Sequence, residues 1–251
     1  MKKIFCLTLL LLLSFQVFSQ IEDSERLVFV ASYNMSGLMT QLAQVTMETQ
    51  KVSTSRNTFL HLKVTASTFS RWDSYFRIRD VYESYVNPQT LVPSLYNRDV
   101  SEGSYTKKEK YVYQPDRRTV NATVRRGNDE EQNRTFTKRA EAVDIVAAIY
   151  QLRKVDISKL SVGQTIPIVI IFDEKEVNAQ IRYMGKETRN VGKLGRKECY
   201  KLSIAASTDV LKGRDRNLIW LTADDNKIPV FMQFSIPVGT GQLELTEMRL
   251  N

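Results

Sequence analysis

Long runs in which apolar and polar residues alternate restrict the fold of this 251-residue chain more than any other feature. Leu60, Leu62 and Val64 alternate with His61 and Lys63, and similar runs recur at 119–125, 177–183 and 200–206. A period of two with one apolar face is typical of an antiparallel sheet that is covered on one side. Turn signals such as Asn87-Pro88 separate the runs. The pattern predicts about a dozen strands, several of them long, in a curved sheet, half-barrel or sandwich.

One segment, residues 140–154, has a helical pattern instead. Val143, Val146, Ala147 and Tyr150 form one apolar stripe, and a second stripe lies beside it. Two stripes predict a helix that is buried on more than one side. Arg153 and Lys154 suit the negative end of its dipole. We therefore expect a mainly β protein with one buried helix near 140–154. Residues 20–251 form one domain, or two strand-rich halves that meet near 140–160.

The N-terminus has the three parts of a secretory signal peptide: the basic pair Lys2-Lys3, an apolar run at 4–13 and small residues ending at Ser19. The apolar run is shorter than the roughly 20 residues that span a bilayer. We expect cleavage after Ser19, which leaves Gln20 first and lowers the net charge from +8 to +6 by removing two lysines. We find no other span in the mature chain and expect a soluble protein of the periplasm or cell envelope.

Several common chemistries have little support in the sequence. His61 is the only histidine and falls on the polar face of its run, which argues against histidine-based metal sites and a Ser/His/Asp triad. Cys199 would be the one cysteine of the mature chain, and a half-buried structural thiol is the favoured interpretation. The stretch 224–226 (Asp-Asp-Asn) lacks the spacing of a calcium loop and predicts a hairpin turn. Glu130-Glu131 falls in a polar loop, where solvation is expected rather than glycosidase chemistry. We therefore expect no catalytic residues, no metal and no cofactor.

Basic residues are spread along the chain in pairs such as Lys107-Lys108, Arg117-Arg118 and Arg125-Arg126. Basic strands with exposed tyrosines are able to bind nucleic acid, but export makes that partner improbable. Weak attraction to anionic lipid or polysaccharide surfaces fits an exported protein better. Ordinary solubilising charge on sheet edges is the plainest interpretation.

A cluster of aromatic residues between 69 and 105 is the most suggestive local feature. Aromatic side chains in strand-rich proteins line apolar clefts that bind lipids or glycans, although they also simply fill the core. The candidate ligand-binding residues are Phe69, Trp72, Tyr82, Tyr85 and Tyr96, with Tyr75, Phe76 and Tyr105 in the same cluster.

A series of spaced motifs resembles a known bacterial family. The motifs are Tyr82-Glu83-Ser84 with Asn87, Thr90-Leu91 and Pro93; Glu102-Gly103; Tyr150-x-Leu152-Arg153 with Asp156, Leu160 and Gly163; Gly185-x-Glu187; Trp220-x-Thr222 with 224–226 and Pro229; and Leu243-x-Leu245. In order and spacing over residues 25–250 they resemble the exported family known as domain of unknown function 3108. The chain departs from that family at Ser24-Glu25-Arg26, where a glycine-glutamate pair is usual. The resemblance implies a largely antiparallel envelope protein without established catalytic residues.

These features favour a non-catalytic envelope protein whose curved sheet binds an apolar or amphipathic ligand or a lipoprotein. The expected half-barrel around an apolar helix looks like periplasmic lipoprotein carriers, a likeness of architecture only. A structural or assembly factor that docks envelope proteins through its strand edges is the alternative, and a carboxylate-based hydrolase comes third.

Overall fold

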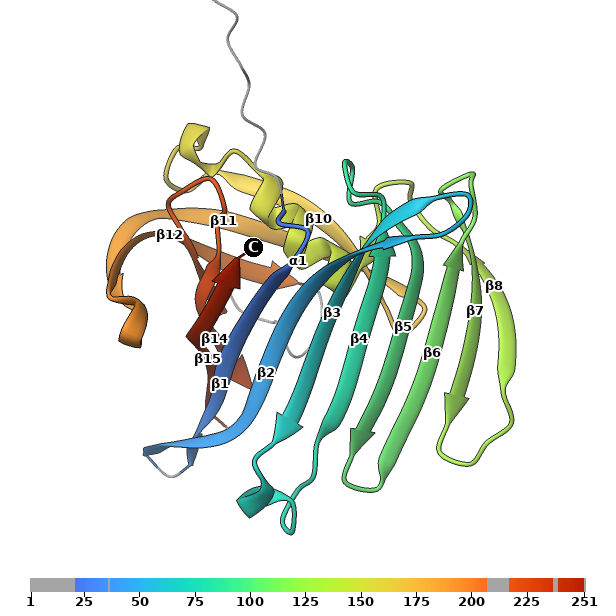
Figure 1. Ribbon diagram of the computed structural model, residues 1–251, viewed down its shortest axis with the longest axis horizontal. Helices are drawn as coiled ribbons and strands as arrows, with labels where there is room; N and C mark the ends of the chain where they lie inside the picture. Colours follow the sequence, from blue (N-terminus) through green and yellow to red (C-terminus); the bar gives the residue numbers. More distant parts are fainter. Residues whose placement is uncertain (1–20, 36, 207–216, 237–238, 251) are drawn as a thin grey trace, which may run out of the picture.

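The alternating runs form the strands of one long, strongly curved sheet (Figure 1). A computed structural model describes residues 21–35, 37–206, 217–236 and 239–250. The predicted signal peptide, residues 1–19, lies outside the described residues. None of the helices in the described ranges is long and apolar enough to cross a membrane.

The first half of the chain supplies eight strands. They are β1 (Glu25–Met35), β2 (Leu38–Ser53), β3 (Thr58–Thr68), β4 (Arg79–Val86), β5 (Pro93–Glu102), β6 (Tyr105–Tyr113), β7 (Thr119–Arg126) and β8 (Gln132–Thr137). Each pairs antiparallel with the next, and the 3₁₀ turn η1 (Ser70–Trp72) lies between β3 and β4. This meander is the simplest connection that alternating strands and short turns allow.

The second half supplies the remaining strands and the helix. They are β9 (Val143–Asp144), α1 (Ile145–Lys154), β10 (Thr165–Phe172), β11 (Lys175–Asn190), β12 (Arg196–Ala206), β13 (Leu218–Thr222), β14 (Pro229–Ile236) and β15 (Gly239–Leu250). Short 3₁₀ turns η2 (Ile157–Lys159) and η3 (Gly192–Leu194) interrupt the connections. The last strand, β15, pairs with β1, so in the part of the chain that the structure describes the two halves form one 15-stranded sheet, in the order β8–β1, then β15–β9.

The curve of the sheet wraps around α1, and the main core lies between them (Figure 1). Ala147 and Tyr150 of the helix are fully buried with Leu27, Phe29 and Leu62 of the sheet. A second apolar cluster packs Leu152 and Ile157 against β11, β12 and β13. The expectation of a mainly β fold with long antiparallel strands, a curved sheet and one buried helix is confirmed. Of the three forms expected (curved sheet, half-barrel or sandwich), the strands form a single curved sheet and not a sandwich.

The helix begins later than the sequence pattern predicts, at Ile145 and not near residue 140. Asp144 is its N-cap, and its carboxylate accepts a hydrogen bond of 2.9 Å from the Ala147 amide. Val143 and Asp144 form a short strand that pairs in parallel with β10. This pairing ends at Asp144, directly before the helix. The apolar stripe therefore runs through a strand residue before it becomes helical.

Arg153 and Lys154 lie in the last turn of α1, at the negative end of the helix dipole as expected. The Arg153 guanidinium is also buried, and it forms two 2.7 Å hydrogen bonds to the buried carboxylate of Glu25. Arg153 therefore ties the end of α1 to the start of β1 through a bidentate ion pair.

Side chains from β8 and the β10–β11 turn meet across the open side of the curve. Arg134 of β8 contacts Glu174 at 3.3 Å, and Arg139, which follows β8, contacts Glu176 at 2.8 Å. Asp173 and Glu174 have φ values of 50° and 61°, as the two central residues of a tight hairpin turn require. The curve is thus closed by ion pairs, whereas its strands are joined by backbone hydrogen bonds.

Candidate functional site

Three connections at one end of the sheet are joined by hydrogen bonds into one surface. They are the β1–β2 end, the β3–β4 connection at 69–78 and the β5–β6 turn at 103–104, at the lower end of the view in Figure 1. The Trp72 indole donates to the Gln41 carbonyl at 2.8 Å, and the Phe69 amide donates to the Leu42 carbonyl at 2.9 Å. On the other side, the Gly103 amide donates to the Arg77 carbonyl at 2.8 Å. The three connections therefore have fixed positions relative to one another.

This surface carries large apolar side chains that face solvent. Tyr75 is 81% exposed, Leu38 74% and Phe76 52%, and Met39 and Tyr105 are also exposed. Phe69 and Trp72 beside them are partly buried. Scattered exposed apolar residues are normal, but a contiguous group marks an interaction site. We call this group the apolar rim; its members are Leu38, Met39, Phe69, Trp72, Tyr75, Phe76 and Tyr105.

Local turns hold the aromatic members of the apolar rim. The Trp72 amide donates to the Phe69 carbonyl, and the Trp72 carbonyl accepts from the Tyr75 and Phe76 amides. The Trp72 and Tyr75 rings lie 5.9 Å apart. Gly103 has a φ of +59°, and a side chain there would meet the Phe76 ring at 3.4 Å. The 3.4 Å separation is ordinary van der Waals contact, so the positive φ, and not the space beside Phe76, is what favours glycine at the β5–β6 turn.

Arginine side chains give the apolar rim a positive character. Arg71 lies over the Phe69 ring at 5.3 Å, and Arg77 is exposed. Asp73, the acid of the β3–β4 connection, bonds to Arg79 at 2.5 Å and accepts from Thr68 at 2.6 Å. These hydrogen bonds hold the pKa of Asp73 below its ordinary value. Because Arg79 already neutralises Asp73, Arg71 and Arg77 remain as the net charge of the connection.

The structure does not bring the five candidate ligand-binding residues together. Phe69 and Trp72 belong to the apolar rim. Tyr96 is 2% exposed and packs against Tyr111 in the core, with ring centroids 5.4 Å apart. Tyr82 lies on the inner face near the Arg98 guanidinium, while Tyr85 lies on the outer face and stacks on His61 at 4.3 Å. Tyr82 and Tyr85 are three residues apart on one strand, so they point to opposite faces.

Leu38 and Met39 of the apolar rim were missed by the sequence interpretation. Their only signal is an apolar pair directly after Gly37, whose amide donates to the Asn34 side chain in a turn. An apolar pair at a hairpin end, where solvation is expected, is the feature that would have indicated them.

Charged side chains are buried on the inner face, near the tip of the β10–β11 turn. Arg98 of β5 contacts Glu109 at 2.9 Å and Asp173 at 2.7 Å. Lys107 is buried and contacts the same two carboxylates at 2.7 and 2.6 Å. This inner charged cluster holds the β10–β11 turn against β5 and β6. Arg98 and Lys107 are both paired with carboxylates of the fold, so their contacts are structural.

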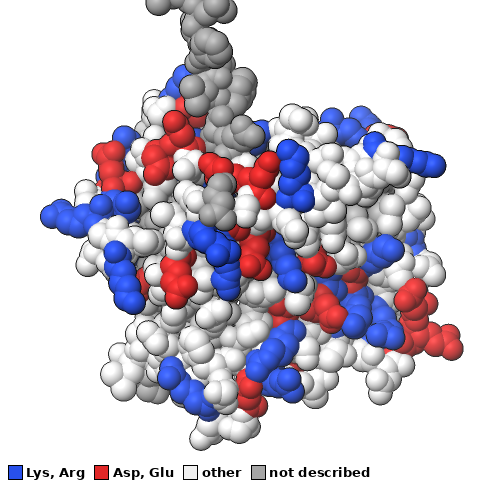
Figure 2. Space-filling model, viewed as in Figure 1, with Lys and Arg blue, Asp and Glu red and all other residues white. Residues whose placement is uncertain are grey.

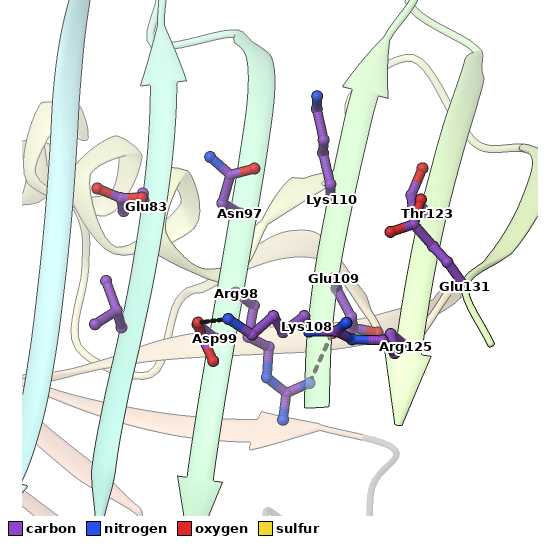
Figure 3. Close-up of a pocket in the computed structure, with 11 residues that line it drawn as sticks. Glu83, Asn97, Arg98, Asp99, Lys108, Glu109, Lys110, Thr123, Arg125 and Glu131 are labelled. Atoms are coloured by element: carbon purple, nitrogen blue, oxygen red, sulfur yellow. Dashed lines mark hydrogen bonds and ion pairs between the residues drawn. The ribbon is translucent and has the colours of Figure 1, made fainter. Parts of the chain in front are cut away.

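A polar hollow of about 490 Å³ lies across β4–β7 (Figure 3). We call it the outer-face hollow. Lys108 in it pairs with Asp99 at 2.6 Å, and the Glu83 carboxylate at its margin accepts a 3.0 Å hydrogen bond from the His61 ring. Its lining is mostly charged or amide-bearing and includes Asn97, Lys110, Thr123, Arg125 and Glu131. Such a lining does not suit an apolar ligand.

The other residues considered as sites have structural surroundings. Cys199 is buried, and burial raises the pKa of its thiol to about 11, which disfavours the reactive thiolate. Asp224 accepts from the Thr222 hydroxyl and the Asn226 and Lys227 amides, so the predicted hairpin turn is confirmed. Glu130 and Glu131 are exposed. Over the described ranges, no three His, Cys, Asp or Glu side chains are grouped as metal ligands.

An open sheet that curves around one helix, with ion pairs closing the gap, defines a β-barrel-like protein. The chain belongs to the family of proteins of unknown function DUF3108, whose sequence profile matches residues 29–246. The family resemblance read from the motifs is therefore confirmed.

Solved structures share this architecture at low sequence identity. A β-barrel-like protein with domain of unknown function DUF1849 from Brucella abortus is 9% identical, with a TM-score of 0.57 over 92% of this chain and 99% of that chain. A protein assigned as exported, with a YmcC-like fold, from Bacteroides fragilis is 7% identical, with a TM-score of 0.38 over 92% and 98% of the two chains. The first likeness supports the fold, and the second is too distant to support more. No curated protein matches the chain in sequence.

Proposed function

We propose that this protein is a non-catalytic binding module of the cell envelope, exported by its N-terminal signal peptide. Its apolar rim would engage an apolar or amphipathic ligand, including the acylated end of a lipoprotein. The observation that carries the proposal is the exposure of Tyr75, Leu38 and Phe76 on connections that are hydrogen-bonded to one another. A surface of this kind costs solubility and is retained where it binds a partner.

The surroundings of the rim support binding rather than chemistry. Within the described residues, the rim carries no histidine or cysteine, and its one acid at 69–78, Asp73, is committed to Arg79 and Thr68. Aromatic side chains with polar tips, such as Trp72 and Tyr75, contact acyl chains and headgroups at the same time. An amphipathic ligand therefore fits the rim better than a fully polar one.

Trp72→Ala tests the proposal. Because Trp72 is only partly buried, we expect this variant to keep a near-normal unfolding midpoint while it binds a monomeric fluorescent lipid analogue about tenfold more weakly, or about 1.4 kcal/mol. Tyr85→Ala is the matched control, since it removes a partly buried aromatic ring on the outer face. A large loss of stability in Trp72→Ala would instead assign Trp72 to the core.

The wild-type protein decides between this proposal and the alternative. If it binds no lipid analogue, the proposed ligand class is wrong. A stable envelope-protein partner, recovered by native mass spectrometry, would then place the assembly factor first.

A further inference from the structure

We propose that the apolar rim docks on the surface of a lipid bilayer that contains anionic headgroups, with the strands of β1–β6 standing end-on to the membrane. This inference rests on the proposed function and names the partner of the same surface. The geometry of the rim, its residue types and its charge each support it.

The rim projects instead of enclosing a space. Its exposed members sit at the ends of hairpins and on the β3–β4 connection, which lie at the lower end of the sheet (Figure 1), and their side chains face solvent. The outer-face hollow described above lies on the strands and is polar. A projecting apolar surface is suited to enter a bilayer interface, whereas a cavity is suited to enclose a single lipid.

The residue types are those found at membrane interfaces. Trp and Tyr concentrate at the headgroup level, where the ring is apolar and the N–H or O–H is wet. Trp72 and Tyr75 lie together in the rim, and its exposed Phe76 and Leu38 side chains suit the acyl boundary. The rim backbone does not offer an open strand edge, because the Phe69 and Gly103 amides are already bonded. A bilayer therefore matches the rim better than a partner strand.

Charge favours an anionic bilayer over a neutral one. Arg71 and Arg77 flank the aromatic residues, and Asp73 is neutralised by Arg79. Figure 2 shows both basic and acidic side chains among uncharged ones at the lower end of this face. Exposed arginines near a bilayer surface are attracted by anionic headgroups, and added salt weakens that attraction.

The test is sedimentation with vesicles of phosphatidylcholine, with and without phosphatidylglycerol. We expect the wild-type protein to bind the mixed vesicles and the double variant Tyr75→Ser/Phe76→Ser to bind about tenfold more weakly. Val162→Ser is the control, because Val162 is 72% exposed but lies in the loop before β10, outside the rim. An equal loss of vesicle binding in Tyr75→Ser/Phe76→Ser and in Val162→Ser would overturn the assignment of binding to the rim.

A second pair of variants tests the charge. Arg77→Gln should weaken binding to the phosphatidylglycerol vesicles only, and its effect should disappear at about 1 M salt, where the Debye length is about 3 Å. Arg56→Gln removes the same charge from the β2–β3 turn, at the opposite end of the strands, and should change nothing. An Arg77→Gln effect that is equal on neutral vesicles would contradict the electrostatic part.

The position of Trp72 gives an independent readout. The chain has two tryptophans, and Trp220 is buried, so quenching by brominated lipid should report Trp72. Vesicle binding without quenching would overturn docking through the rim. A protein that binds the monomeric lipid analogue but no vesicle would refute the docking and leave the proposed function intact, whereas one that binds neither would refute both.

Discussion

At the residue scale, Asp144 combines two opposing effects: it caps the helix α1, and its burial disfavours the charged carboxylate. Its carboxylate is fully buried, accepts from the Ala147 amide and the Ser84 hydroxyl, and caps α1. Burial raises its pKa from an ordinary 3.8 to about 6, against the opposing effect of those hydrogen bonds. The side chain thus stabilises the start of the helix through its hydrogen bond from the Ala147 amide, whereas burial disfavours its charged form.

The stability of the protein should therefore depend on pH at Asp144. Between about pH 4 and 6, the folded chain retains a proton at Asp144 that the unfolded chain releases, so raising the pH lowers the free energy of unfolding. Each unit of pKa difference is worth about 1.4 kcal/mol. Asp144→Asn keeps an oxygen for the cap and removes the titration. We expect this variant to gain stability relative to wild type as the pH rises from about 4 to 7.

Urea unfolding of both proteins across that pH range checks the prediction. Asp80, whose pKa burial also raises to about 6, is present in both and cancels in the comparison. A stability difference that stays constant with pH would show that Asp144 keeps an ordinary pKa.

The sequence predicted which side of a strand a residue faces, but not which distant residue it pairs with. Alternation correctly placed Leu60 and Leu62 inside and His61 outside, because strand geometry fixes that relation. It could not indicate that Arg153 pairs with Glu25, because the two residues are 128 positions apart and meet only in the folded chain. The same limit applies to Asp173, whose partners are Arg98 and Lys107.

At the scale of elements, the helix is the part of the fold most sensitive to substitution. Ala147 is fully buried between α1 and the sheet. Ala147→Glu would bury a carboxylate without a partner, which costs several kcal/mol, about as much as many domains have in total. We expect loss of soluble yield or a sharply lower melting temperature.

Val162→Glu is the matched control, since it introduces the same carboxylate at an exposed apolar position. It should melt close to the wild-type temperature. An Ala147→Glu variant with an unchanged melting temperature would show that this side of the helix is open to solvent.

The elements also show where sequence patterns stop being informative. The helix start was placed about five residues early, because the apolar stripe already begins at Val143 of β9, and only Asp144, the last residue of β9 and the cap of α1, separates Val143 from the helix. The apolar rim lies on turns and hairpin ends, where no periodicity applies. The aromatic cluster was therefore recognised, but its division between core, outer face and rim was not.

At the scale of the whole molecule, the β1–β15 pairing decides the architecture. It joins the two ends of the described chain and turns two strand-rich halves into one sheet. Local patterns predict strands and turns but not a pairing over this separation, so half-barrel and sandwich both remained open. The family resemblance supported the class of fold without specifying the strand order.

Export is a prediction for the whole molecule, based on Lys2-Lys3, the apolar run at 4–13 and the small residues that end at Ser19. N-terminal sequencing of the protein recovered from its native host should give Gln20 as the first residue. An intact Met1 in the mature protein would contradict cleavage.

The central claim is that the apolar rim is the binding surface, and amide hydrogen exchange tests it most directly. Exchange would be compared with and without a short-chain phosphatidylglycerol. We expect slower exchange at 37–42, 69–78 and 103–106, where the rim connections lie, and unchanged exchange on β4–β7 around the outer-face hollow. Protection centred on the outer-face hollow, or no protection at a lipid concentration that saturates binding, would contradict the account.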